Sequence, residues 1–306
     1  MLAGPNHSAR VLAVVNRKGG VGKTTTAINL AHGLSRKLIR YVKPEDLDKV
    51  TDTGRLYQYR ERSYYLLGHV LLIDLDPQGH CARALGVTPA EADVGDVLMG
   101  QQHLSRAVVS ADRAADGYPR PNLWLLPASD NLERAKETLR NQSFEYLVSG
   151  YDNRDHWLLG VIQQRLRLAR ERFRYVILDC APGLDIFSHA VYQFADEAIV
   201  PVKPDYLSVA GAGQNIADIR SEQLRGIDIR INTILPTFNV SQQRLDRQLV
   251  SELRSAHGRL VGEPIPRSQM MAEAPAHQVT VFEADPAHRN PATRAYQKLV
   301  DRVHHA

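Results

Sequence analysis

The sequence predicts an α/β protein built on a doubly wound, mostly parallel sheet flanked by helices. One observation is a glycine-rich turn that joins an apolar run, Val11 to Val15, to a segment with helical spacing that ends near Lys37. Another is a set of short apolar runs that end in aspartate or proline, as buried parallel strands do at the edge of a sheet. Helical segments separate these runs, which favours βα units over hairpins.

Each later element is assigned from its own pattern. Five further strands are expected from continuous apolar runs: His69–Asp76, Asn122–Pro127, Tyr175–Asp179, Glu197–Val202 and Ile229–Pro236. Helices are expected where apolar residues recur at helical spacing: Asp93–Gly100, a helix opening at Ala128–Leu132, His156–Arg172, Val209–Leu224, Gln242–Ala256 and Pro291–Val303. The polar stretch from Asn141 to Arg154 has no assignment.

The overall composition narrows the class of protein. The 306 residues are 43% hydrophobic and 24% charged, which suits one large domain, residues 1–306, with a packed core. The net charge of +4 permits a nucleic-acid partner without establishing one, because it is dilute over this length. Cys81 and Cys180 form no paired motif, and Met1 to Arg10 holds no secretory segment, so a cytoplasmic location is expected. No apolar run approaches the ~20 residues that span a bilayer.

The stretch from Lys18 to Thr25 reads Lys-Gly-Gly-Val-Gly-Lys-Thr-Thr and lies between a strand and a helix. This is the context that a phosphate-binding loop requires, because glycines let backbone N–H groups close around an anion and the helix start adds positive charge. In such a loop Lys23 reaches the β- and γ-phosphates and the Thr24 hydroxyl ligates Mg²⁺. The expected nucleotide-binding residues are Gly19, Gly20, Val21, Gly22, Lys23, Thr24 and Thr25.

The loop departs from the general phosphate-loop pattern at its start. Arg17 stands where the first glycine belongs, and an extra lysine, Lys18, follows it. This deviant Walker A motif resembles that of the ParA/MinD family of P-loop ATPases. The resemblance implies that ATP and Mg²⁺ are the cofactors. It also implies a catalytic role for Lys18, which in the family crosses an ATP-sandwich homodimer to the phosphates of the partner.

Three aspartates end predicted strands. Asp74 and Asp76 belong to Asp-Leu-Asp-Pro-Gln-Gly, which is similar to the second motif of the ParA branch. The resemblance implies that Asp76 orients the attacking water and that Asp74 supports the magnesium site. Asp179 ends a strand that resembles Walker B and would bind the metal, with Thr24 as a further ligand. A cap on the following helix is the open alternative for Asp74 and Asp76.

Other parts of the resemblance concern the nucleotide base and an insertion. In the family the end of the last strand forms the adenine pocket, which here points to Thr237, Asn239 and Pro266. Relatives pass from the first helix to the second strand in a few residues, so residues 39–68 are expected to be an insertion. Its interleaved tyrosines and arginines could contact nucleic acid. Packing of an extra helix or hairpin on the domain surface is favoured.

The function implied by the resemblance is an ATPase that acts in plasmid or chromosome partitioning. The ATP-bound dimer would bind nonspecific DNA on the nucleoid, and a ParB-like protein would trigger hydrolysis. The candidate DNA contacts are Arg244, Arg247, Arg254 and Arg267. Met270 stands where many ParA-like chains carry a second basic residue, which weakens this part of the resemblance.

Three other functions share the fold. A MinD-like switch on a membrane or protein cargo needs a C-terminal amphipathic helix rich in bulky apolar residues, which Tyr296 to Ala306 lacks. An electron-transfer ATPase needs cluster cysteines at a spacing that this chain does not have. An amidoligase like cobyrinate synthetase stays open, although no residue marks a site for a second substrate.

Overall fold

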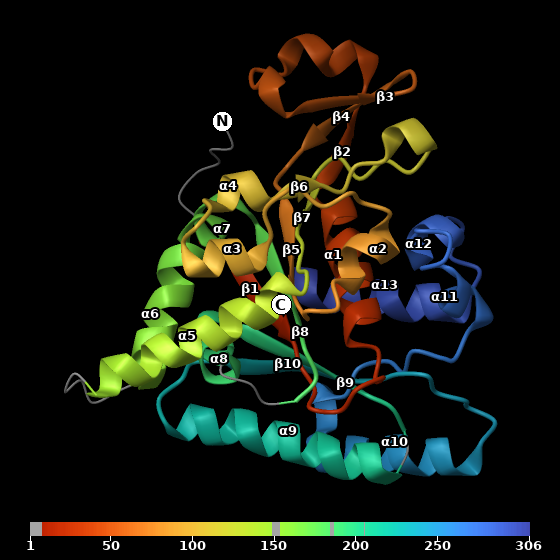
Figure 1. Ribbon diagram of the computed structural model, residues 1–306. Coiled ribbons are helices and arrows are strands. Elements are labelled where there is room, and N and C mark those ends of the chain that lie inside the picture. The colour runs from red at the N-terminus through yellow and green to blue at the C-terminus, as the bar shows by residue number, and fades with distance from the viewer. Residues whose placement is uncertain (1–7, 149–153, 184–186, 205) are drawn as a thin grey trace.

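The computed structural model describes residues 8–148, 154–183, 187–204 and 206–306 (Figure 1). A central sheet has the strand order β10-β9-β1-β8-β5-β7-β6, and all of its neighbours are parallel except β6 and β7. Its strands are β1 (Arg10–Val14), β5 (Val70–Leu75), β6 (Val109–Ser110), β7 (Leu123–Leu126), β8 (Tyr175–Cys180), β9 (Glu197–Val202) and β10 (Arg230–Pro236). The predicted doubly wound α/β fold and its six strands are confirmed, and β6 adds a short edge.

Alternating side chains of the strands enter two separate cores, one on each face of the sheet. In β1, Val11 and Ala13 join one core while Leu12 and Val14 join the other. One face is covered by α1 (Lys23–Lys37), α2 (His80–Leu85), α11 (Gln269–Glu273), α12 (Val281–Ala284) and α13 (Pro291–His305). The other is covered by α3 (Val94–Met99), α4 (Leu104–Ala107), α5 (Asn131–Val148), α6 (Arg154–Arg165), α7 (Arg167–Arg172), α8 (Ser188–Phe194) and α9 (Tyr206–Leu224). A further helix, α10 (Arg244–His257), lies beside α9 (Figure 1).

Two helical boundaries differ from the expectation. Residues 141–148 of the unassigned polar stretch continue α5, whose Leu132, Ala135 and Leu139 are buried along one side, and residues 149–153 lie outside the described residues. The single helix expected at 156–172 is divided at Leu166 into α6 and α7. Periodicity alone misses this break, since the apolar side of both helices faces the same core.

The C-terminal helix α13 is part of the core. Its apolar residues pack against α1, where Gly33 lets the two helices approach so closely that a Cβ at this position would lie 2.3 Å from Val300. The residues of α13 that are buried are Ala292, Thr293, Ala295, Tyr296, Leu299, Val300 and Val303. The apolar face of α13 is therefore buried in the core.

Residues 39–66 form a small antiparallel sheet of their own, with the strand order β2-β4-β3. The strands are β2 (Ile39–Val42), β3 (Leu56–Tyr59) and β4 (Arg62–Leu66), and two 3₁₀ turns, Pro44–Lys49 and Thr53–Arg55, connect β2 to β3. This sheet extends from the end of α1, opposite the loop that precedes α1 (Figure 1). The Tyr57 hydroxyl donates to Asp112 at 3.2 Å, whereas Tyr41 is 50% exposed. The expected hairpin is present, and only some of its tyrosines pack on the body.

Candidate active site

The glycine-rich loop turns between β1 and α1 at the carboxyl edge of the sheet. Gly20 and Gly22 have φ angles of 69° and 86°, in the left-handed region that favours glycine. Among the described residues no side chain caps the start of α1, which is the arrangement that an anion site at a helix N-terminus requires. The buried ammonium of Lys23 donates to the Lys18 carbonyl at 2.9 Å across this loop. The loop thus has the shape and the positive charge to bind phosphates.

Burial controls the charge of Lys23. It lowers the pKa of the ammonium, and the neighbouring Asp179, Cys180 and Asp76 oppose that shift. An anion placed in the loop would further favour the charged form, because opposite charges at short range stabilise each other. The site is thereby complementary to a negatively charged ligand.

Asp74 and Asp179 face each other across β5 and β8, where they are register partners. Both are 1% exposed, and no described ion pair involves either one. Burial raises the pKa of Asp179 to about 8 and that of Asp74 to about 6, and each carboxyl is further affected by a neighbouring one. A hydrogen bond from Thr24 to Asp179 opposes the shift. Two carboxyl groups and a hydroxyl are the oxygen donors that Mg²⁺ prefers, so this donor set fits the ion.

Cys81 completes this cluster. Its thiol donates to Asp179 Oδ2 at 3.4 Å, and its backbone N–H donates to Asp74 Oδ2 at 3.1 Å. Because Cys81 lies in the first turn of α2, Asp74 also holds the start of that helix, which is the alternative role considered for it. The sequence pattern predicts no role for Cys81 beyond the lack of a paired-cysteine motif, although its position two residues after the Asp-Leu-Asp-Pro-Gln-Gly motif is a usable signal.

Asp76 is half-buried, and its backbone N–H donates to Asp74 Oδ1 at 3.0 Å. Its Oδ1 accepts a hydrogen bond from the Gln78 backbone at 3.0 Å, and α2 is capped by Gly79 rather than by Asp76. Lys18 is also half-buried, and its N–H donates to Asn16 Oδ1 at 2.8 Å. The structure places Lys18, Lys23 and Asp76 at the same edge of the sheet.

A cavity of about 680 Å³ opens beside the loop. The residues that line it are Gly20, Thr25, Lys203, Phe238, Arg267, Ser268, Gln269, Met271, Ala272 and Pro275. Its size and its mixed lining suit an organic ligand with an anionic group. It lies next to the glycine-rich loop, and Phe238 approaches that loop so closely that its ring would lie 3.3 Å from a Cβ on Gly22.

The residues expected at the base lie around this cavity rather than in its lining. Thr237 is buried and donates to the Val21 carbonyl at 2.8 Å, which fixes the loop. Asn239 pairs through its backbone with Pro266. Sequence analysis missed Phe238, whose positive φ of 53° turns the chain after β10. Lys203 was also missed, although its place just after β9 was a usable signal.

The four candidate arginines are all exposed. Arg244, Arg247 and Arg254 lie on one side of α10, because they are three and seven residues apart, and Leu249 and Leu253 are buried on the other side. Arg267 lies apart from them and lines the large cavity.

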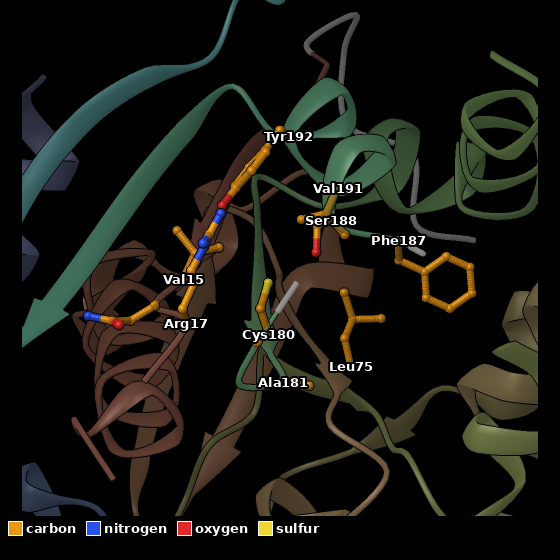
Figure 2. Close-up of a pocket in the computed structure, with 11 residues that line it drawn as sticks. Val15, Arg17, Leu75, Cys180, Ala181, Phe187, Ser188, Val191 and Tyr192 are labelled. Carbon is orange, nitrogen blue, oxygen red and sulfur yellow. The ribbon is translucent and has the colours of Figure 1, made fainter. Parts of the chain in front are cut away.

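A small cavity of about 30 Å³ lies behind the loop, between β1, β8 and α8 (Figure 2). Arg17, Cys180, Ser188 and Tyr192 are among the residues that line it. In this view the guanidinium of Arg17 points toward the hydroxyl end of Tyr192.

Comparisons with known proteins agree with this geometry. A family model described as "AAA domain" matches residues 9–67 and 62–232. The chain is 30% identical over 298 residues to the chromosome-partitioning ATPase Soj of Thermus thermophilus, covering 96% of this chain and 95% of Soj. It is 29% identical over 300 residues to the chromosome partitioning protein ParA of Caulobacter vibrioides, covering 96% and 93%.

Solved structures show the same fold. The ATP complex of Cyanothece McdA superposes with a TM-score of 0.73 at 20% identity, over 98% of both chains. Cobyrinic acid a,c-diamide synthase of Mycobacterium smegmatis, with a bound ATP analogue and magnesium, has a TM-score of 0.65 at 26% identity, over 96% of this chain and 93% of that one. The family match and the near-complete coverage of Soj together show that the chain belongs to the AAA domain family and is a P-loop ATPase of the ParA/Soj type.

Proposed function

We propose that this chain is an ATP-driven partitioning switch that forms a sandwich dimer on nonspecific DNA and is released by a ParB-like activator. The observation that carries the proposal is the loop itself. The Lys23 ammonium donates to the Lys18 carbonyl within the loop, and the loop lies at the same edge of the sheet as the buried pair Asp74 and Asp179. Lys23 would serve the phosphates bound by its own loop, and the extra lysine, Lys18, is the residue that the resemblance to the ParA/MinD family assigns to the phosphates of a partner subunit.

Each residue has a separate task in this proposal. The backbone from Gly19 to Thr25 would bind the phosphates of ATP, and Lys23 would add the positive charge that hydrolysis requires. Thr24, Asp74 and Asp179 would hold Mg²⁺, which neutralises phosphate charge when bound. Asp76 would hold a water in line with the terminal phosphate. Thr237, Asn239 and Pro266 would shape the wall around the base, and Phe238 and Pro275 would contact it.

Lys18 would act across the dimer. A cation added to a phosphoryl-transfer site accelerates hydrolysis by about 10³ to 10⁵. Hydrolysis in the dimer and assembly of the dimer would then depend on the same nucleotide state, because ATP favours one of two states and DNA binds that state. The switch would operate in the cytoplasm, on the nucleoid.

The arginine side of α10 would contact DNA phosphates, with Arg267 nearer the nucleotide. Exposed arginines at helical spacing match the regular negative charge of a duplex. The membrane alternative has less support, because the apolar side of α13 is packed on α1. Among the described residues, none of the helices is long and apolar enough to cross a bilayer.

The decisive test is a gel shift of Asp76→Ala protein on nonspecific duplex DNA, with and without Mg-ATP, at two salt concentrations. We expect ATP binding without turnover, a dimer by light scattering, and a DNA shift only with ATP that weakens as salt rises. The double variant with Lys18→Ala should stay monomeric. If the ATP-bound dimer forms but does not bind DNA, the result would instead favour a switch that acts on a protein or membrane cargo.

The DNA surface has its own test in the same assay. Arg247→Ala and Arg254→Ala should each lower the slope of log K against log salt by about one. Arg134→Ala is the matched control, since Arg134 is an exposed arginine on α5, away from α10. Equal slopes in all three variants would mean that α10 does not contact DNA.

A further inference from the structure

Arg17, the residue that replaces the first glycine of the loop motif, is tied to a distant helix. Its guanidinium pairs with the carboxylate of Asp218 on α9: Nη2 donates a hydrogen bond to Oδ1 at 2.8 Å, and Nε lies 2.7 Å from Oδ2 as an ion-pair contact without hydrogen-bond geometry. The side chains are only 33% and 23% exposed. A half-buried, charge-assisted hydrogen bond of this kind is stronger than an exposed surface ion pair.

The backbone around Arg17 is fixed as well. The Arg17 carbonyl accepts a hydrogen bond from the Gly183 N–H at 2.9 Å, in the turn that follows β8. The preceding residue, Asn16, donates through its side chain to the Pro201 carbonyl of β9 at 2.7 Å. Arg17 thus joins the phosphate loop to the turn beyond Asp179 through its backbone, and to α9 through its side chain.

The same side of α9 also reaches α8. Glu222 lies one helical turn beyond Asp218, and its carboxylate contacts His189 of α8 at 2.8 Å. α8 in turn lines the small cavity beside Arg17 through Ser188 and Tyr192 (Figure 2). One side of α9 is therefore bonded both to the loop that would bind phosphates and to the helix that follows the metal-binding strand.

We propose that Arg17 is a positioning residue that sets the backbone of Lys18 and couples the phosphate loop to α9 through Asp218. This inference rests on the proposed function, in which Lys18 contacts the partner subunit. The peptide unit before Lys18 is held by the Arg17 anchors, and the Lys18 carbonyl accepts the Lys23 ammonium. A change at the phosphates that moves Lys23 or Lys18 must act on the Arg17–Asp218 pair, and so on α9.

Arginine is the residue that this task requires. Its planar guanidinium matches the two oxygens of a carboxylate, whereas a lysine ammonium makes a single point contact. Arg17→Lys should therefore behave like Arg17→Gln, even though it keeps the charge. That outcome separates positioning from a simple contribution of positive charge.

The test is a double-mutant cycle in the Asp76→Ala background, with ATP-dependent dimerisation measured by analytical ultracentrifugation. Arg17→Gln and Asp218→Asn should each weaken the dimer about tenfold, and the double variant should be no weaker than either single one. Arg220→Gln, an exposed arginine on another side of α9, is the matched control and should leave the dimer unchanged. Losses that simply multiply in the double variant would overturn the coupling.

Two further readings make the result unambiguous. Thermal unfolding of each variant separates a folding defect from lost positioning, because a purely structural pair would lower Tm and leave the dimer affinity of the folded protein unchanged. If the Asp76→Ala parent stays monomeric with ATP, the sandwich part of the proposed function fails. The same cycle is then scored on Mg-ADP affinity of the monomer, where additive losses would overturn the role of Arg17.

Discussion

Two buried clusters of charge lie on neighbouring parts of this molecule, and they are built in opposite ways. In one, the fully buried Arg120 donates from Nε and Nη2 to both oxygens of Glu283, at 2.7 and 2.9 Å, and its remaining donors reach the carbonyls of Leu85 and Gln278. In the other, Asp74 and Asp179 place two carboxyl groups side by side without an ion-pair partner among the described residues.

The pKa values show the same contrast. Burial alone would raise the pKa of Glu283, but the hydrogen bonds from Arg120 hold it below its usual value. Burial raises the pKa of Asp74 and Asp179, and the neighbouring carboxyl adds to the increase. In the Arg120–Glu283 cluster each charge has an opposite charge as its partner, which stabilises the fold. The Asp74–Asp179 cluster holds two carboxyl groups, which are suited to bind a cation.

The position of each cluster fits its role. The Arg120 cluster connects the loop before β7 with α2 and α12, and α12 follows the segment that lines the large cavity. The aspartate pair lies at the carboxyl edge of the sheet, where ligands of such sheets bind. The comparison teaches that burial alone does not distinguish the two clusters, whereas the presence or absence of an ion-pair partner among the described residues does.

The largest effect should come from breaking the Arg120–Glu283 cluster. Arg120→Met leaves Glu283 buried without its partner, which typically costs about 3–5 kcal/mol. We expect that loss in the free energy of unfolding from urea titration. Glu283→Gln in the same background should restore part of it, because it removes the unpaired charge. A loss below about 1 kcal/mol would mean that water replaces the arginine and that the cluster is not closed.

The next largest effect should come from the Asp74–Asp179 cluster, where we expect a substitution to leave the stability of the fold unchanged or to increase it. Asp179→Asn replaces a buried carboxyl that burial already disfavours in its charged form, so the metal-free protein should be as stable as wild type or more stable. Mg²⁺-dependent ATP hydrolysis should fall by a factor of at least about 10². Both quantities are measured on the same preparation, by thermal unfolding with EDTA and by phosphate release. A drop in both would make Asp179 structural.

A smaller effect concerns the dependence of thermal stability on pH in the acidic range. His32 packs beside the Arg120 cluster, and its Nδ1 is 2.7 Å from Thr280 Oγ1. Burial lowers its pKa to about 3, so the folded state keeps this ring neutral while the unfolded chain takes up a proton near pH 6.5. The stability that depends on a neutral His32 is complete above about pH 6.5 and is lost as the pH falls toward 3. Tm should therefore decrease from pH 6.5 to 5, less steeply in His32→Gln; parallel curves would contradict this.

The smallest effect should come from substitution of an exposed arginine that, like Arg120, pairs with a glutamate. Arg167 pairs with Glu171 one turn along α7 at 2.7 Å, and its side chain is 69% exposed. Arg167→Met should cost no more than roughly 0.5 kcal/mol in the free energy of unfolding. Because the substitution is the same as at Arg120, the difference between the two variants measures what burial adds to an ion pair.

The sequence alone was sufficient for the elements whose signal is local. Each predicted strand of the central sheet is present, because a continuous apolar run between polar ends can bury itself only inside a sheet with both faces covered. The loop from Lys18 to Thr25 could also be predicted from the sequence, since the glycines, the lysine and the helix start are neighbours along the chain. The three-stranded form of residues 39–66 was only partly predicted, since its register depends on pairing between β2 and β4.

The parts that escaped prediction depend on residues far apart in the chain. Arg17 meets Asp218 across 201 positions, and Arg120 meets Glu283 across 163. Phe238 closes on Gly22 only because β10 and β1 end at the same edge of the sheet. The sequence by itself determined the fold class, the phosphate loop and the aspartates that end the strands, because those depend on local spacing and on the burial of apolar runs. Only the tertiary structure decided which charges are neutralised and which stay open for a ligand, because that depends on which strands and helices the fold brings together.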